Sequence, residues 1–394
     1  MVYPRQGSYI EYIVDNSSNK GGLKRMRSLL VGVGAAGNKA VMTAIEQGSV
    51  KEENTIMINS TSKDFPQGYS GKTIILSPDD TGCGKEQAIA KGYAISAIKA
   101  GKFNIEGIES YSMVIICTSV EGGTGSGSTP LIAEFFSDFL KKNTHVIAFT
   151  GFEEDVRGLS NTVEFFKSLS QKLIIQTIRN KSFLRKANNN KFKAEELANL
   201  EMCKRIEILT AKNFIPSSQN IDDTDIMKVS NTAGYMTIEH RFIEKPLADQ
   251  DEFNHVVKKM IYESASIKSN DPGASRIGVI LNVDPMSEDA IDFTFATILE
   301  AYGMPFEKFM QKQWDGKKEY IALIVSGMQM PIDEIKAVYD RYKEESERVN
   351  KNADMFFAET KDLGMSEEDT MFNMIRPVER NQGSIDDFLS KFEN

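Results

Sequence analysis

The chain has 394 residues, a formal net charge of −9 and a hydrophobic fraction of 41%, which are typical of a soluble globular protein with two or three domains. No stretch approaches the roughly 20 apolar residues of a membrane span, and the first residues lack the basic-then-apolar order of a signal peptide. The acidic balance argues against direct nucleic-acid binding, and three scattered cysteines and three histidines argue against a disulfide framework or a zinc site, so we expect a cytoplasmic protein without membrane insertion.

Short apolar runs alternate with amphipathic helical patterns in the first half of the chain. This alternation predicts a parallel β-sheet covered by helices on both faces. The predicted strands are 28–34, 54–60, 72–77, 112–119, 144–150 and 172–178. The predicted helices are 38–48, 85–101, 131–142, 159–171 and a long one at 193–214.

A polar segment at 215–231 separates this half from a second, smaller α/β unit that begins near residue 232. The predicted elements of that unit are helices at 251–266 and 287–303 and strands at 276–283 and 319–328. A long charged helix is predicted from residue 332, followed by an acidic tail.

Two strand-to-helix turns are rich in glycine. The first, Gly32 to Asn38, matches GxGxxG, a dinucleotide-binding pattern that also occurs in tight turns without a ligand. The second, EGGTGSGSTP at 121–130, is expected to be a loop between a buried strand and an apolar helix. Backbone amides and the helix dipole favour phosphate in such a place. Neither turn has the Gly-Lys-Ser/Thr ending of a Walker P-loop.

The second turn resembles the signature GGGTGTG/SG of the tubulin and FtsZ superfamily, with Glu121 in place of the first glycine. Further stretches are similar, in the same order, to the family's first, second and third nucleotide loops and to its sixth strand with an asparagine turn. They are GVGAAGNKAV, IMINSTSKDF, TGCGKE and KLIIQTIRNKSFLRKA. The resemblance covers about residues 28 to 330 and implies a Rossmann-like GTPase domain that binds GTP with Mg²⁺.

The resemblance also implies which residues bind the nucleotide. They are Gly34, Ala35, Ala36, Gly37, Asn38, Lys39, Asn59, Gly82, Cys83, Gly84, Gly122, Gly123, Thr124, Gly125, Ser126, Gly127, Asp155, Arg157, Asn161, Asn180 and Asn199. This chain departs from the family at several of these loops. The second loop, Asn59-Ser60-Thr61, lacks the usual acid, Arg157 stands where a glutamate is common, and Asn161 stands where an arginine is common. Glu195 also replaces a base-stacking aromatic residue.

The acidic segment NIDDTDI at 220–226 has two interpretations. Its composition alone is typical of a turn and helix N-cap. Within the resemblance, Asn220, Asp222 and Asp225 match the synergy loop, Asn-x-Asp-x-x-Asp, which enters the nucleotide site of the next subunit and activates the attacking water. The resemblance therefore implies a GTPase that hydrolyses GTP in a head-to-tail homopolymer.

The implied organisation has five parts. They are an N-terminal extension (1–27), a GTP-binding domain (28–193), a central helix and synergy loop (194–231), a C-terminal GTPase-activating domain (232–331), and a C-terminal helix with an acidic tail (332–394). This layout resembles the plasmid and phage members of the family, the TubZ and PhuZ type, which position plasmid or phage DNA or particles. Such a role implies a DNA-binding adaptor protein as a partner.

Three alternatives stay open on the sequence. One is a division-ring protein. The end of the tail is faintly similar to the partner-binding peptide of such proteins, through Ile385, Phe388, Leu389 and Phe392. A frayed tail, or an amphipathic contact with a neighbouring subunit, would explain these residues equally well. Another is a filament protein that binds nucleotide and barely hydrolyses it. The third is an NAD-binding oxidoreductase built on the first turn, with Glu52 and Glu53 near the expected distance for a ribose contact.

Overall fold

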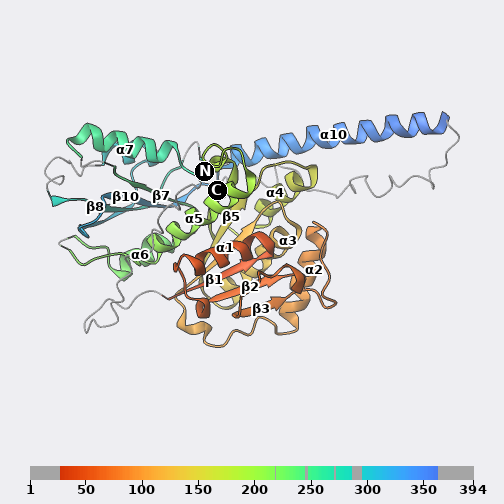
Figure 1. Ribbon diagram of the computed structural model, residues 1–394, viewed down its shortest axis with the longest axis horizontal. Coiled ribbons are helices and arrows are strands. Elements are labelled where there is room, and N and C mark those ends of the chain that lie inside the picture. The colour runs from red at the N-terminus through yellow and green to blue at the C-terminus, as the bar shows by residue number, and fades with distance from the viewer. Residues whose placement is uncertain (1–26, 218, 245–246, 270–271, 286–294, 363–394) are drawn as a thin grey trace, which may run out of the picture.

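The computed structural model describes residues 27–217, 219–244, 247–269, 272–285 and 295–362 (Figure 1). The predicted N-terminal extension, the first part of the helix predicted at 287–303 and the acidic tail lie outside the described residues.

The described residues contain ten strands that form one mixed sheet, in the order β3-β2-β1-β4-β5-β6-β7-β10-β8-β9. The strands of the first half are all parallel, as the sequence predicts. They are β1 (Ser28–Val33), β2 (Thr55–Asn59), β3 (Lys72–Ile75), β4 (Met113–Ser119), β5 (Asn143–Thr150) and β6 (Ile174–Arg179). This order reverses direction between β1 and β4, which is where open α/β sheets bind ligands.

The second half contributes four strands, in which β10 pairs antiparallel with both β7 and β8. They are β7 (Gly234–Phe242), β8 (Arg276–Asn282), β9 (Glu307–Gln313) and β10 (Tyr320–Met328). The halves are joined by a short parallel pairing of β6 with β7, at Ile174 with Gly234 and at Ile175 with Tyr235. The predicted strands at 276–283 and 319–328 are confirmed, whereas β7 and β9 were not predicted.

Helices cover both faces of the sheet (Figure 1). In the first half they are α1 (Gly34–Glu46), α2 (Gln87–Lys99), α3 (Gly123–Glu134), α4 (Val156–Ser168) and α5 (Lys191–Leu209). In the second half they are α6 (Asp223–Ser230), α7 (Gln250–Tyr262), α9 (Ala296–Tyr302) and α10 (Ile332–Asp362). Short turns complete the list: η1 (Glu52–Asn54), η2 (Ser62–Asp64), η3 (Ile108–Ser110), η4 (Phe135–Phe139) and η5 (Asn180–Phe183).

Successive side chains of each parallel strand point to opposite faces of the sheet and so contribute to two hydrophobic cores. Leu29, Val31 and Val33 of β1 belong to the core on one face, which also contains residues of α2, α3, α4, α7, α9 and α10. Leu30 belongs to the core on the other face, which also contains residues of α1, α5 and α6. Because both faces are covered, these strands are apolar throughout, and each fully buried Leu, Val or Ile contributes about 1.5–3 kcal/mol.

One predicted helix boundary is wrong. The sequence predicts a glycine loop at 121–130 and a helix from residue 131, but α3 already begins at Gly123. The predicted polar segment at 215–231 contains α6, whose N-cap is Asp222. The long helix predicted from residue 332 is confirmed as α10, which runs along α4 and extends beyond the rest of the described structure (Figure 1). Among the helices of the described ranges, none combines the length and apolar character needed to cross a membrane.

Candidate functional site

The first glycine turn joins β1 to α1 and is held close to β4. Gly34 adopts the left-handed conformation, with φ of 75°, which an L-residue would adopt at a cost. A Cβ on Gly37 would collide with the carbonyl group of Cys117 in β4, so only glycine allows α1 to approach the sheet this closely. Asn38 is fully buried and donates from Nδ2 to the carbonyl of Ile58 at 3.2 Å. Ala35, Ala36 and Lys39 are exposed at the surface of this turn.

The second glycine turn joins β4 to α3, and its glycines serve close packing rather than unusual backbone angles. Gly122 is the extended N-cap of α3, and the following glycines are helical. A Cβ on Gly123 would lie 2.5 Å from the Cα of Lys85, and one on Gly127 would lie 2.5 Å from the carbonyl oxygen of Gln87. A Cβ on Gly125 would collide with the Thr118 hydroxyl. The N-terminus of α3 is therefore wedged between β4, β1 and the segment that precedes α2.

The two turns meet at the point where the strand order reverses. A Cβ on Gly34 would lie 3.0 Å from the backbone nitrogen of Gly125. The hydroxyl of Thr124 lies 2.8 Å from that of Ser60, after β2, and 3.1 Å from the thiol sulfur of Cys83. The structure thus brings together the first, second and third loops and the α3 N-terminus, as the sequence predicts. The contribution of Ser60 was not predicted.

Buried asparagines with unsatisfied atoms mark the same edge of the sheet. Asn38 Oδ1, Asn59 Nδ2 and Asn180 Oδ1 are buried and have no hydrogen-bond partner among the described residues. Asn38 lies in the first turns of α1 after β1, Asn59 ends β2, and Asn180 follows β6. A buried polar atom without a partner costs about 1–3 kcal/mol. Three such atoms at the carboxyl ends of parallel strands indicate a polar ligand site.

Two ion pairs beside the α3 N-terminus join the third loop to the start of α4. Lys85 Nζ lies 2.8 Å from Asp155 Oδ2, and Arg157 Nη2 lies 2.8 Å from Glu86 Oε1. Although burial opposes it, the hydrogen bond from Lys85 holds the pKa of Asp155 below its ordinary value. Asp155 also caps α4, because its Oδ1 accepts from the Gly158 amide at 2.7 Å.

Asn161 of α4 holds the third loop and the start of the second glycine turn in place. Its Nδ2 donates to the carbonyl oxygens of Lys85 and Glu121, both at 3.1 Å. Gly82 and Gly84 belong to the same third loop, where Gly84 has φ of 55°. These hydrogen bonds give Asn161 a positioning role between the third loop and the second glycine turn.

The remaining predicted residues lie on neighbouring or distant elements. Asn199 is half-buried on α5, which packs against α1. Asn220, Asp222 and Asp225 lie near α6, at the opposite end of the molecule from α2 and α3 (Figure 1). Within one chain the structure therefore does not bring the acidic segment to the glycine turns.

The acidic segment is held in place by several hydrogen bonds. Asp222 caps α6, accepting from the Asp225 amide at 2.8 Å, so the N-cap interpretation is confirmed. Asn220 Oδ1 accepts from the Ser217 amide at 2.7 Å, and the Ile221 amide donates to Gln311 of β9 at 2.8 Å. Asn220 and Asp222 are exposed, so both are free to face another molecule.

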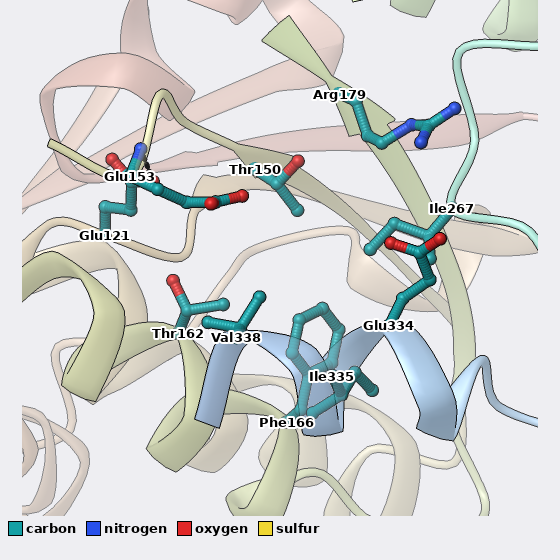
Figure 2. A pocket seen from close by; sticks show the side chains of 10 residues that line it. All are labelled: Glu121, Thr150, Glu153, Thr162, Phe166, Arg179, Ile267, Glu334, Ile335 and Val338. Carbon is teal, nitrogen blue, oxygen red and sulfur yellow. Dashed lines mark hydrogen bonds between the residues drawn. The ribbon is translucent and has the colours of Figure 1, made fainter. Parts of the chain in front are cut away.

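A small cavity of about 50 Å³ lies between α10, α4 and Glu121, the residue before the second glycine turn's Gly122 (Figure 2). It has room for one or two waters and is far smaller than a nucleotide pocket. Its lining residues are Glu121, Thr150, Glu153, Thr162, Phe166, Arg179, Ile267, Glu334, Ile335 and Val338.

Comparison with known proteins agrees with this geometry. Residues 27–188 match the Tubulin/FtsZ family, GTPase domain. The cell division protein FtsZ 1 of Methanocaldococcus jannaschii is 24% identical over 218 residues, which are 53% of this chain and 58% of that protein. The tubulin-like protein TubZ of Clostridium botulinum C phage is 36% identical over 101 residues, 25% of this chain and 28% of that protein. The chain thus spans between 28% and 58% of the length of the curated relatives that it matches first.

Solved structures share the fold over a longer range. TubZ of Clostridium botulinum phage c-st has a TM-score of 0.66 and 18% identity, covering 82% of this chain and 99% of that one. CetZ1 from Haloferax volcanii has a TM-score of 0.63 and 17% identity, covering 81% and 99%. The predicted α/β fold is therefore confirmed.

Proposed function

We propose that residues 27–188, which match the GTPase domain of the Tubulin/FtsZ family, form such a domain, and that the chain binds GTP where β1 and β4 end and assembles head to tail. The observation that supports this most strongly is the junction of Gly34 with Gly125 at the α3 N-terminus. Backbone amides there have no partner within the helix and attract phosphate. The hydroxyls of Thr124 and Ser60 add polar groups at the same edge.

Magnesium would arrive with the nucleotide. Among the described residues there is no group of three or more His, Cys, Asp or Glu side chains that could hold a metal ion. Mg²⁺ in such sites is bound mainly by phosphate oxygens and water, and it neutralises charge on the phosphates. The hydroxyl oxygens of Thr124 and Ser60, which lie 2.8 Å apart, are placed to contribute oxygen ligands beside the proposed phosphate position.

Hydrolysis is proposed to need a second subunit. Asn220, Asp222 and Asp225 lie in or just before α6, at the opposite end of the molecule from α2 and α3, so a head-to-tail contact would place them against the neighbour's glycine turns (Figure 1). A carboxylate can orient the attacking water as a general base. Such a heterologous contact does not close on itself and so gives a filament.

The proposed cellular role is to move or position plasmid or phage DNA or particles in the cytoplasm through a DNA-binding adaptor protein. The long helix α10, which follows β10 almost directly, supports this over a division-ring role. The oxidoreductase alternative is weakened by Glu52. Its Oε1 accepts from the Ser70 amide at 2.6 Å and the Gly71 amide at 3.1 Å, so it stabilises a turn.

The test follows light scattering and phosphate release together after GTP, GDP or ATP is added with Mg²⁺. Scattering that rises with GTP and falls as phosphate appears supports the proposal; if NAD binds and GTP does not, the proposal is wrong. Asp222→Asn removes the charge but keeps a good N-cap. We expect it to bind GTP and polymerise, with phosphate release reduced about 100-fold or more, the range of a lost general base.

Asp249→Asn is the matched control for that variant. Asp249 caps α7 just as Asp222 caps α6, accepting from the Glu252 amide at 2.9 Å. It should hydrolyse GTP at the wild-type rate. Normal turnover by Asp222→Asn would remove the acidic segment from the mechanism while leaving GTP binding to be judged separately.

A further inference from the structure

The loop between β5 and α4 contains three successive carboxylates, each paired with a different part of the fold. Glu153 pairs with Lys181 after β6 and with Arg341 of α10, at 2.7 and 2.5 Å. Glu154 pairs with Lys191 at the start of α5, and Asp155 pairs with Lys85 of the third loop. A single short loop thus contacts the nucleotide site, the central helix and the C-terminal helix.

Glu153 is held in an unusual backbone conformation. Its φ is 56°, in the left-handed region, where a non-glycine residue is kept only by its surroundings. Its amide donates to Oε1 of Glu121 at 2.8 Å, the contact drawn in Figure 2. Glu121 is the residue before Gly122, the N-cap of α3, so this hydrogen bond ties the loop to the glycine turn.

The surroundings of the Glu121 carboxylate disfavour its charged form. Burial raises the pKa of its carboxyl group, the amide of Glu153 acts in the opposite sense, and the nearby carboxylates of Glu153 and Asp155 raise it further. A Cβ on Gly151 would collide with it. Because the Glu121 carboxylate is buried beside other carboxylates and packed closely against Gly151, it is well suited to position its neighbours.

Arg341 of α10 makes the last contact in a series that runs from Glu121 through Glu153 to α10. Its Nη1 bonds the Glu153 carboxylate, and its Nη2 bonds the carbonyl oxygen of the same residue at 3.1 Å. Arg341 therefore restrains the backbone of Glu153 as well as its side chain. Glu334, Ile335 and Val338 of α10 line the cavity that also contains Glu121 and Glu153 (Figure 2).

We propose that α10, through Arg341, Glu153 and Glu121, positions the phosphate-binding end of α3, and that Arg341 is a positioning residue for the bound nucleotide. This inference rests on the proposed function for its ligand, GTP. A partner that pulls α10 away from α4 would then weaken nucleotide binding from a distance.

The decisive variant is Arg341→Gln in the full chain. The Arg341 side chain is 46% exposed and Lys181 still pairs with Glu153, so we expect a loss of GTP affinity of about three- to fivefold, the effect of one exposed pair. Arg348→Gln is the matched control on the same helix, because Arg348 pairs with Glu345 of its own turn. It should leave GTP affinity unchanged.

A double variant separates positioning from general stability. In a Glu121→Ala background the contact series is already broken, so adding Arg341→Gln should cause no further loss of GTP affinity. If the two losses instead add fully, α10 does not act through Glu121 and the inference is wrong.

Amide hydrogen exchange tests the same series without nucleotide. Arg341→Gln should speed exchange in peptides 121–130 and 150–156, and Arg348→Gln should not. Faster exchange in a protein that fails to bind GTP would support the contact series while refuting the proposed ligand. Unchanged exchange and unchanged GTP affinity in Arg341→Gln would overturn the inference.

Discussion

Gly127 offers a direct test of why the α3 N-terminus is built from small residues. A Cβ at this position would lie 2.5 Å from the carbonyl oxygen and 2.7 Å from the Cα of Gln87, whereas ordinary contact begins at 3.4 Å. In Gly127→Ala the backbone at the start of α2 would therefore have to move by about 0.9 Å. Overpacking of this kind costs about 1–3 kcal/mol.

Helix propensity works against that cost. Alanine stabilises a helix interior over glycine by about 0.5–1 kcal/mol. The net expectation for Gly127→Ala is a loss of about 1–2 kcal/mol. Gly92 provides the matched control, because it is a helical glycine in α2, the helix that packs on α3, and a Cβ there would meet nothing within 4 Å. Gly92→Ala should gain about 0.5–1 kcal/mol.

The assay is urea unfolding of both variants and the wild type, followed by circular dichroism. The midpoint should fall for Gly127→Ala and rise for Gly92→Ala, with similar slopes. If Gly127→Ala is as stable as Gly92→Ala, the glycines of α3 are not required for close packing, and the account of the glycine turn given above is wrong.

Three further predictions concern the same half of the sheet. Gly123→Ala should lower the urea midpoint because its Cβ would meet the third-loop backbone at 2.5 Å. Gly122→Ala, whose Cβ would meet nothing within 4 Å, should lower it less, by the weaker N-cap of α3 alone, about 0.5–1 kcal/mol. Burial lowers the pKa of His145 from 6.5 to about 3, so the unfolded chain binds the extra proton first and stability falls as pH drops below 6.5. His145→Leu should remove about 2 kcal/mol of that loss at pH 5, measured by urea unfolding at pH 7 and pH 5; equal acid sensitivity in both proteins would contradict this. Burial raises the pKa of the Cys203 thiol to about 12 and that of Cys117 as well, so both should react with a disulfide reagent only after unfolding; rapid reaction of the native protein would show that they are accessible.

The parallel strands were predictable because their side chains are apolar on both faces, whereas β7 and β9 were not. In β9 the two buried side chains are Gln311 and Gln313, which bond to the segment before α6. In β7 the buried Glu239 accepts from the hydroxyl of Ser264 at 2.5 Å. The other buried side chains of β7 are the polar Thr237 and the apolar Tyr235, Met236 and Ile238, so polar and apolar residues are mixed there. Hydrophobic periodicity is weak in a strand whose buried positions are wholly or partly polar and satisfied by distant residues.

The candidate site was predictable in its loops and not in the contacts between them. The glycine density of 121–130 correctly marks a special turn, but composition favours a loop, and only the nearness of Lys85 and Gln87 explains why glycines form a helix there. Glu121 stands out as a departure from the family signature. Its partner Glu153 is 32 positions away, a distance that sequence spacing does not encode.

The order of strands in the sheet also has a consequence for synthesis on the ribosome. β10 is the last strand to be made, yet it lies between β7 and β8 and pairs with both. The strands β1 to β6 can pair once residue 179 has emerged, but β7 and β8 must wait with unpaired, apolar edges until residue 328 follows. Nascent chains that stall in this interval would expose strands prone to aggregation, so truncation before β10 should yield insoluble protein.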